Sequence, residues 1–402
     1  MAKLDTLIKE HKPGFSLPQA FYTDEEIYQL DLEKIWHRNW LFAGHVSRIP
    51  NTGDYFLFEM DRESLIIIRD KNETIHAHFN VCRHRGSAVC LKEAGNAQQL
   101  VSPYHHWSYN HDGSLRSARM MSEDFDRSAY GLKHAHVQIL EGLIFVSLAK
   151  DPPDFQPFLD DAGPHLKHQG IADAKICYSE RIELNANWKL ATENFMECGH
   201  CALAHPQYAK IHGIKNRMSK EDEEAYNAYV KQQQEKVAAC GFNEVSKSFT
   251  RERWYHFSHF CLHPGFETQS LDGKPVAPLM GMHKEYGGVM NTITYPFFFL
   301  EAGPDLFVTF SVTPKSPTLS IVDAHWYVDK NAEEGKDYCV ERVIGAWKAT
   351  GDQDWILTEN NQKGVNSIAY QPGPYSPSQE ALCRVFLEWY LDQVSDKVPG
   401  SQ

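Results

Sequence analysis

Short apolar segments fill positions 42 to 148, and turn-forming residues interrupt them at close intervals. Among these segments are "DYFLFEM", "SLIIIRD" and "HVQILEGLIFVSL", which are rich in β-branched and aromatic residues. Such runs, separated by Gly, Asn and Asp, are typical of antiparallel strands joined by tight turns. The sequence therefore predicts a small all-β domain over residues 41–150.

Two turns of this β domain carry pairs of possible metal ligands. They read "CRHRG", with Cys82 and His84, and "SPYHHW", with Ser102 and His105. When two imidazoles replace two thiolates on one iron of a [2Fe–2S] cluster, the reduction potential rises. The spacing C-x-H followed by C-x-x-H on β loops indicates such a Rieske [2Fe–2S] centre, bound by these four positions. A chance cluster of histidines and a tetrahedral zinc site are the alternatives, and we rank both lower.

Ser102 stands where this pattern has a thiolate. A serine oxygen is hard and has a very high pKa, whereas iron–sulfur sites select the soft thiolate. Ser102 is either an engineered or variant substitution that weakens or abolishes the cluster, or a native residue beside a cluster bound through an alkoxide or not bound at all. We favour the substitution because the residues around Ser102 still follow the pattern. Cys90 is nearby, but its use would require a different loop path.

The remainder of the chain predicts a second domain. A chain of 402 residues is too long for a single ordinary core. The proline-rich stretch at 150–158 is interpreted as a linker, and helices and strands alternate over 159–402. Residues 1–40 predict a helical segment, with Thr23 as a helix N-cap, that packs on the second domain. The fold class is therefore α+β. Helices are expected at 184–205, 217–240, 334–361 and 377–394, and strands at "WYHFSHFCL", "VMNTITYPFFFLEA", "LFVTFSVTP" and "LSIVDAHWYVD".

A second candidate metal site lies in "ENFMECGHCALAHP". On the helix predicted there, Glu197 and His200 would lie one turn apart on the same face. His205 precedes a proline, so the helix would end nearby and bring the second imidazole toward the first. Two histidines and one carboxylate on one face of Fe(II) leave positions open for O₂ and substrate.

The carboxylate of this site need not be close in sequence. The late segment "GDQDWILTENNQKG" offers Asp352, Asp354 and Glu359 on a predicted helix. From the residues alone the choice stays open, because "DQDW" also fits an ordinary solvated helix face. A direct ligand role for Glu197 also stays open.

Both sites, in this order and separation, resemble those of the catalytic (α) subunits of Rieske non-haem iron oxygenases. The resemblance runs from about residue 30 to 365 and is carried by "CRHRG…PYHHW", "NWKLATENFMECGHCALAHP" and "DQDW". It implies an N-terminal all-β Rieske [2Fe–2S] domain, followed by a helix-grip-like antiparallel sheet domain with a mononuclear iron site. It also selects Asp354 as the iron ligand beside His200 and His205, and it places Asn194 close to the iron.

The resemblance further implies how electrons reach the iron. Such chains form head-to-tail homotrimers, in which Glu197 would lie between His200 and His105 of a neighbouring chain. A flavin or ferredoxin-type reductase would supply electrons from NAD(P)H, and O₂ would be used to hydroxylate a C–H bond.

Within that family, residues 265–281 and 325–338 and "CRHRGSAVC" are similar to oxygenases of quaternary ammonium compounds such as glycine betaine or proline betaine. We therefore expect an N-demethylation that releases formaldehyde. Aromatic faces attract such cations, although core packing is their commoner role. The alternatives are a mono- or dioxygenase that hydroxylates aromatic rings, and a cluster-deficient inactive form caused by Ser102. The aromatic candidates are Trp254, Tyr255, Tyr295, Phe297, Phe298, Phe299 and Trp326.

Composition limits the remaining possibilities. The net charge of −13 argues against a broad nucleic-acid or anionic-membrane surface. The sequence has no run of 18 apolar residues and no signal-peptide core, so we expect no membrane association. The nine cysteines are scattered, which fits metal ligands and free thiols in the cytoplasm better than a disulfide framework.

Overall fold

The computed structural model describes residues 2–214, 219–239, 241–242, 246–285 and 287–395. It divides into two compact units. One is His37–Phe155, and the other joins Met1–Trp36 to Gln156–Gln402.

Three antiparallel sheets build the unit His37–Phe155, as the alternation of apolar runs and turns predicted. The strand orders are β1-β10-β9, β4-β3-β2-β5 and β6-β7-β8. In β3 the consecutive residues Leu65 to Ile68 are all buried. The strands are β1 (Leu41–His45), β2 (Asp54–Met60), β3 (Glu63–Arg69), β4 (Ile75–Phe79), β5 (Ala94–Asn96), β6 (Leu100–Val101), β7 (Ser108–Tyr109), β8 (Leu115–Ser117), β9 (His136–Leu140) and β10 (Leu143–Ser147).

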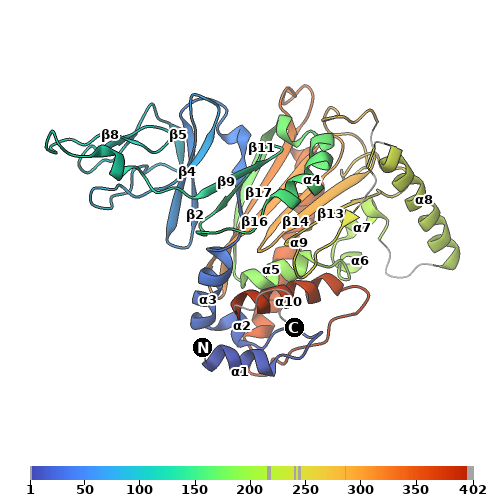
Figure 1. Cartoon of the computed structure of the whole chain (residues 1–402). Helices are drawn as coiled ribbons and strands as arrows, with labels where there is room; N and C mark the ends of the chain where they lie inside the picture. Colours follow the sequence, from blue (N-terminus) through green and yellow to red (C-terminus); the bar gives the residue numbers. More distant parts are fainter. Residues whose placement is uncertain (1, 215–218, 240, 243–245, 286, 396–402) are drawn as a thin grey trace. The chain divides into compact units, whose positions relative to one another are not determined.

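The second unit contains one seven-stranded antiparallel sheet, in the order β11-β17-β16-β15-β14-β13-β12 (Figure 1). Its strands are β11 (Ala174–Leu184), β12 (Ser246–Lys247), β13 (Tyr255–Phe260), β14 (Val289–Thr294), β15 (Phe298–Ala302), β16 (Phe307–Ser316) and β17 (Leu319–Asp329). The helices that follow residue 155 are α4 (Gln156–Gln169), α5 (Trp188–Phe195), α6 (Cys201–Ala204), α7 (Pro206–His212), α8 (Lys220–Ala239), α9 (Val340–Val365) and α10 (Ala381–Val394). Residues 217, 218 and 240 of the predicted 217–240 helix lie outside the described residues.

The stretch "VMNTITYPFFFLEA" is not one strand, as its composition suggested, but a hairpin. Tyr295 and Pro296 form the turn between β14 and β15, because proline has no backbone N–H to donate to a strand ladder. The hairpin register pairs Asn291 with Glu301 and Ile293 with Phe299. These pairs lie on one face of the sheet, since side chains alternate between the two faces.

That face of the sheet packs against α9. The rings of Phe299 and Phe310 lie 5.3 and 5.7 Å from the ring of Trp347 on α9. The opposite face packs against α4, where Phe158 lies 4.8 Å from Tyr255 between ring centroids. The sheet is therefore covered on both faces, as expected for strands with long buried runs.

The N-terminal segment belongs to the same unit as the large sheet. Its helices are α1 (Ala2–Glu10), α2 (Ala20–Thr23) and α3 (Glu25–Asp31), followed by a wider helical turn, Leu32–Trp36. The predicted N-cap at Thr23 is wrong, because the Asp24 side chain accepts hydrogen bonds from the backbone N–H groups of Glu26 and Ile27. A carboxylate at this position satisfies the free donors of the first turn.

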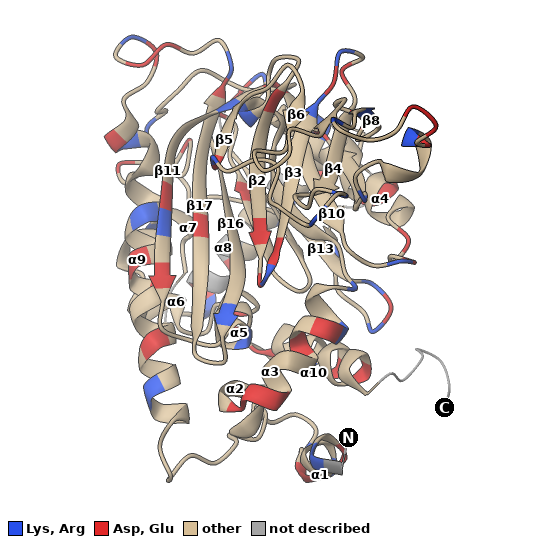
Figure 2. Cartoon of the chain, turned by 90° about the vertical axis from the view of Figure 1, so that its left-hand side faces the viewer, with Lys and Arg blue, Asp and Glu red and all other residues tan. Residues whose placement is uncertain are grey.

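Charged residues of both signs lie close together along the edge strand β11 (Figure 2). They include Lys175, Glu180, Arg181 and Glu183, and Arg181 pairs with Asp323 of β17 at 2.7 Å. Charges on an edge strand discourage pairing with another sheet. Among the described residues, none of the helices has the length and apolar character needed to cross a membrane.

Candidate functional site

The segment that carries both candidate histidines is not the single helix that its sequence predicted. It is divided into α5, α6 and α7, with Glu197 to His200 in the break after α5. Asn187 caps α5 by accepting a hydrogen bond from the N–H of Lys189 at 2.9 Å. A residue before proline is disfavoured in the helical conformation, which explains why the chain leaves the helix at His205.

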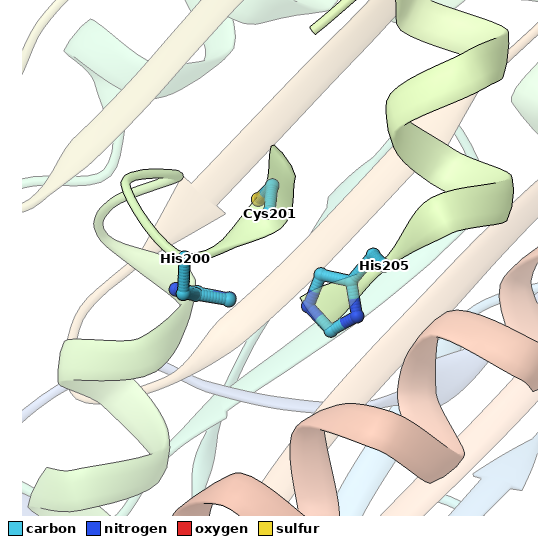
Figure 3. A group of neighbouring side chains, drawn as sticks. All are labelled: His200, Cys201 and His205. Carbon is cyan, nitrogen blue, oxygen red and sulfur yellow. The ribbon is translucent and has the colours of Figure 1, made fainter. Parts of the chain in front are cut away.

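The break brings His200 and His205 together with Asp354 of α9. Their imidazoles lie 5.0 Å apart between ring centroids and face the same space (Figure 3). Asp354 Oδ1 lies 3.4 Å from His200 Nε2 and 2.9 Å from His205 Nε2. All three side chains are thus within reach of one ion.

The other acids of the late helix are engaged elsewhere. Asp352 pairs with Lys348 at 3.0 Å, and Glu359 accepts from the side chain of Asn185 at 2.9 Å. Asp354 is only 4% exposed, and the burial that would raise its pKa is outweighed by contacts with the two histidines, which lower it. It therefore presents a buried carboxylate to both Nε2 atoms.

Each histidine is oriented by a second contact on its other ring nitrogen. His200 Nδ1 contacts the Glu197 carboxylate, and His205 Nδ1 lies 2.9 Å from the Gln353 amide. His205 Nε2 is buried and faces the Asp354 carboxylate, as His200 Nε2 does. Metal-binding histidines have this arrangement, in which one nitrogen is held and the other is free to bind. The donor set of two imidazoles and one carboxylate therefore fits Fe(II).

Two further contacts surround this group. Asn194 donates from Nδ2 to Asp354 Oδ1 at 2.7 Å, which fixes the carboxylate. Cys198 and Cys201 form a disulfide on either side of His200, a bond that the sequence analysis did not predict. Cys201 lies near the two histidines, but a disulfide sulfur is not a thiolate ligand.

A cavity of about 420 Å³ opens beside the histidines. His200 and Asp354 line one part of it, and the side chains of Tyr208, Trp347 and Glu301 line another. Sequence reasoning missed these three residues, because they come from three elements and belong to no common motif.

Most of the aromatic residues proposed from the sequence pack in the core instead. Phe299 lines the cavity, but Tyr295 and Trp326 are almost completely buried elsewhere. Tyr295 stacks on Phe249 at 4.2 Å between ring centroids. Core packing is the more frequent role of such aromatic runs, and the burial of Tyr295 and Trp326 assigns this role to them.

In the β unit, the four positions predicted to bind a cluster lie on two similar loops. Gly86 N donates to Cys82 O at 2.9 Å, and His106 N donates to Ser102 O at 3.0 Å. The rings of His84 and His105 are 4.5 Å apart between centroids, and both project from the loops.

Ser102 is the exception in the chemistry of these loops, not in their geometry. It is 1% exposed, and its Oγ has no hydrogen-bond partner among the residues that the structure describes; the same is true of the buried His84 Nδ1. A buried polar atom without a hydrogen bond destabilises the folded protein. Both atoms are therefore suited to bind a ligand. The loops fit a [2Fe–2S] cluster in shape, with an oxygen in place of one sulfur.

Comparisons with known proteins identify both domains. Residues 39–138 match the Rieske [2Fe–2S] domain, and residues 171–396 match the catalytic domain of ring-hydroxylating α subunits. The chain is 36% identical to the glycine betaine monooxygenase oxygenase subunit of Pseudomonas aeruginosa, covering 96% of this chain and 91% of that protein. The corresponding subunit of Chromohalobacter salexigens is 35% identical, over 98% and 88% of the two chains.

The fold also matches a solved structure. The quaternary ammonium Rieske monooxygenase CntA, in complex with L-carnitine, superimposes with a TM-score of 0.72 at 21% identity, covering 95% of this chain and 96% of that chain.

Proposed function

Because this chain belongs to the Rieske non-haem iron oxygenase α subunits, we propose that it N-demethylates a quaternary ammonium compound. The N-methyl C–H bond is hydroxylated with O₂, and the hydroxymethyl product collapses to formaldehyde and the demethylated amine. The observation that carries this proposal is the 36% identity, over nearly the whole chain, to a glycine betaine monooxygenase subunit. Hydroxylation of an aromatic ring has weaker support from sequence, because the naphthalene and biphenyl dioxygenase subunits align with less than half of this chain.

We assign the mononuclear iron to His200, His205 and Asp354. Bound there, iron supplies the O₂ chemistry, and the cluster supplies electrons. Asn194 and Gln353 keep the carboxylate and one imidazole oriented, through contacts of 2.7 and 2.9 Å. These contacts limit the movement of the ligands, which is the contribution that the protein itself makes.

The same reasoning assigns the cluster to Cys82, His84 and His105, with Ser102 at the fourth position. The cluster site and the iron site are expected to come together between neighbouring chains of a homotrimer. Glu197 would then connect His200 to His105 of the next chain, and its contact with His200 Nδ1 supports that role.

The cavity beside the ligands positions the substrate. The aromatic part of its lining, which includes Tyr208, Phe299 and Trp347, suits an N-methylated cation, since the faces of aromatic rings attract such groups. The substrate enters with one N-methyl group toward Asp354 and His200. A flavin or ferredoxin-type reductase that uses NAD(P)H would be the electron-transfer partner, in the cytoplasm.

Formaldehyde release tests the function directly. The iron-loaded protein, NADH and a glycine betaine monooxygenase reductase are incubated with glycine betaine, and formaldehyde and O₂ uptake are measured. We expect both in equal amounts, and neither in the Asp354→Ala variant. Ring hydroxylation of naphthalene without any formaldehyde from betaines would refute the proposal.

A further inference from the structure

One buried carboxylate in the cavity has no part in metal binding. Glu301 on β15 is 1% exposed, yet it lines the same cavity as His200 and Asp354. Its hydrogen-bond donors among the described residues are neutral: Gln269 Nε2 donates to Oε1, and Tyr208 Oη donates to Oε2 at 3.5 Å. Glutamate is rarely buried without a cationic partner, so a carboxylate placed in this way suits a cation that arrives with a ligand.

The groups that face Glu301 come from every element packed around it. His212 Nε2 lies 3.6 Å from Oε1, and burial lowers the pKa of His212 to about 3, so this imidazole is neutral. Among the described residues, neither lysine nor arginine lines the cavity. The surrounding residues are Tyr208 and His212 of α7, Gln269, Asn291 of β14, Val308 of β16 and Trp347 of α9.

This environment keeps Glu301 protonated while the cavity holds no cation. Burial raises its pKa to about 8, although the hydrogen bonds from Gln269 and Tyr208 lower it in part. A protonated carboxyl group avoids the cost of an unpaired buried charge. A permanent positive charge nearby favours the ionised form instead.

Three aromatic side chains form walls close to this carboxylate. The rings of Tyr208 and Phe299 lie 5.4 and 5.3 Å from the ring of Trp347. Phe299 is two residues before Glu301 on β15, so both side chains lie on the same face of the strand. Aromatic faces and a carboxylate on one wall of a cavity are together what an N-methylammonium group requires.

We propose that Glu301 is the specificity-determining anion of this cavity, which gives up its proton when a quaternary ammonium substrate binds and then pairs with its charge between Tyr208, Phe299 and Trp347. The inference rests on the proposed function and extends it, because it names the group that distinguishes a cation from a neutral molecule of the same shape. The proton passes to solvent, so each bound cation releases one proton while Glu301 is protonated in the free protein.

Calorimetry on the iron-loaded full chain tests this proposal without any variant. The two probes are glycine betaine and 3,3-dimethylbutanoate, which has a neutral carbon in place of the charged nitrogen. Between pH 6 and 8 the Kd for glycine betaine should fall by up to about tenfold per pH unit and then level off. In buffers of different ionisation enthalpy, one proton should be released at pH 6. Binding of 3,3-dimethylbutanoate, which lacks the cationic nitrogen, should release none.

Variants then assign the effect to one residue. Glu301→Gln should weaken glycine betaine binding at pH 8.5 by about 30-fold or more and remove the pH dependence, without weakening the binding of 3,3-dimethylbutanoate, which has no cation to pair with Glu301. Glu301→Asp, which keeps a charge, should retain proton release. Glu193→Gln is the matched control: Glu193 is also buried, with a pKa raised to about 7, but it bonds to Tyr22 and Tyr375. It should bind glycine betaine as the unchanged protein does.

The outcomes distinguish a failure of this proposal from a failure of the proposed function on which it rests. Glycine betaine binding without proton release between pH 6 and 8, or unchanged affinity in a folded Glu301→Gln protein, would overturn the role of Glu301 alone. If the unchanged protein neither binds nor demethylates any betaine, the proposed function fails as well. If the Glu301→Gln protein does not fold, the proton release measured on the unchanged protein decides whether the proposal for Glu301 holds.

Discussion

A buried ion pair next to α5 offers a quantitative test of how the segment proposed to bind iron is held in place. Lys189 of α5 contacts Asp31 of α3, and both side chains are completely buried. Asp31 also accepts hydrogen bonds from Trp188 Nε1 at 3.0 Å and Tyr390 Oη at 2.6 Å. The pair thus joins the N-terminal segment and α10 to the helix that leads to Asn194.

Replacing Lys189 by Met removes one partner and leaves a buried carboxylate with two neutral donors. Burial raises the pKa of Asp31 and lowers the pKa of Lys189, while the contact between them opposes both shifts. Loss of one partner from such a pair costs about 3–5 kcal/mol. The melting temperature should therefore fall by roughly 6 °C or more. A double variant, Asp31→Leu with Lys189→Met, should recover most of this loss, because no unpaired charge remains.

Scanning calorimetry on the single and double variants measures this effect. Lys330→Met is the matched control, since its pair with Asp173 is exposed on both sides, 55% and 66%, and such pairs contribute about 1 kcal/mol or less. The reasoning is refuted if Lys189→Met changes the free energy of unfolding no more than Lys330→Met does. A double variant as unstable as the single one would equally contradict it.

Three further predictions concern the metal sites. Ser102→Cys should raise the bound iron and sulfide and strengthen the Rieske absorbance and EPR signals; equal signals in both proteins would contradict a weakened site. Asp354→Asn should lower mononuclear iron content, measured by metal analysis, whereas the neighbouring Asp352→Asn should not, since Asp352 pairs with Lys348 instead. Gln353→Leu should weaken iron binding about 10–100-fold, because it frees His205 Nδ1. An unchanged iron affinity would show that the Gln353 contact has no orienting role.

Local patterns in the sequence predicted the elements that depend on neighbouring residues. The β unit followed from its turns, and the two histidines followed from their spacing. The single helix over 184–205 was wrong, because Gly199 in the first break and Pro206 after the second disfavour a continuous helix. The hairpin at Tyr295 and Pro296 was missed for a similar reason, since its apolar residues are continuous.

Features that depend on distant residues were less accessible. Asp354 was chosen by resemblance, because nothing in "GDQDW" distinguishes it from Asp352 without the fold. Glu301 and Trp347 meet only because β15 and α9 pack on the same cavity. A buried glutamate inside an apolar strand, "FFLEA", is the one signal that could have drawn attention to Glu301.

The proposed iron ligands come from segments far apart in the chain, His205 just before α7 and Asp354 in the middle of α9. An ion bound by both residues would link two distant segments and thereby close a long loop of the polypeptide. Removing the ion with a chelator would break this link. Amide hydrogen exchange should then accelerate first in the central turns of α9, while the exchange of β16 and β17 stays slow.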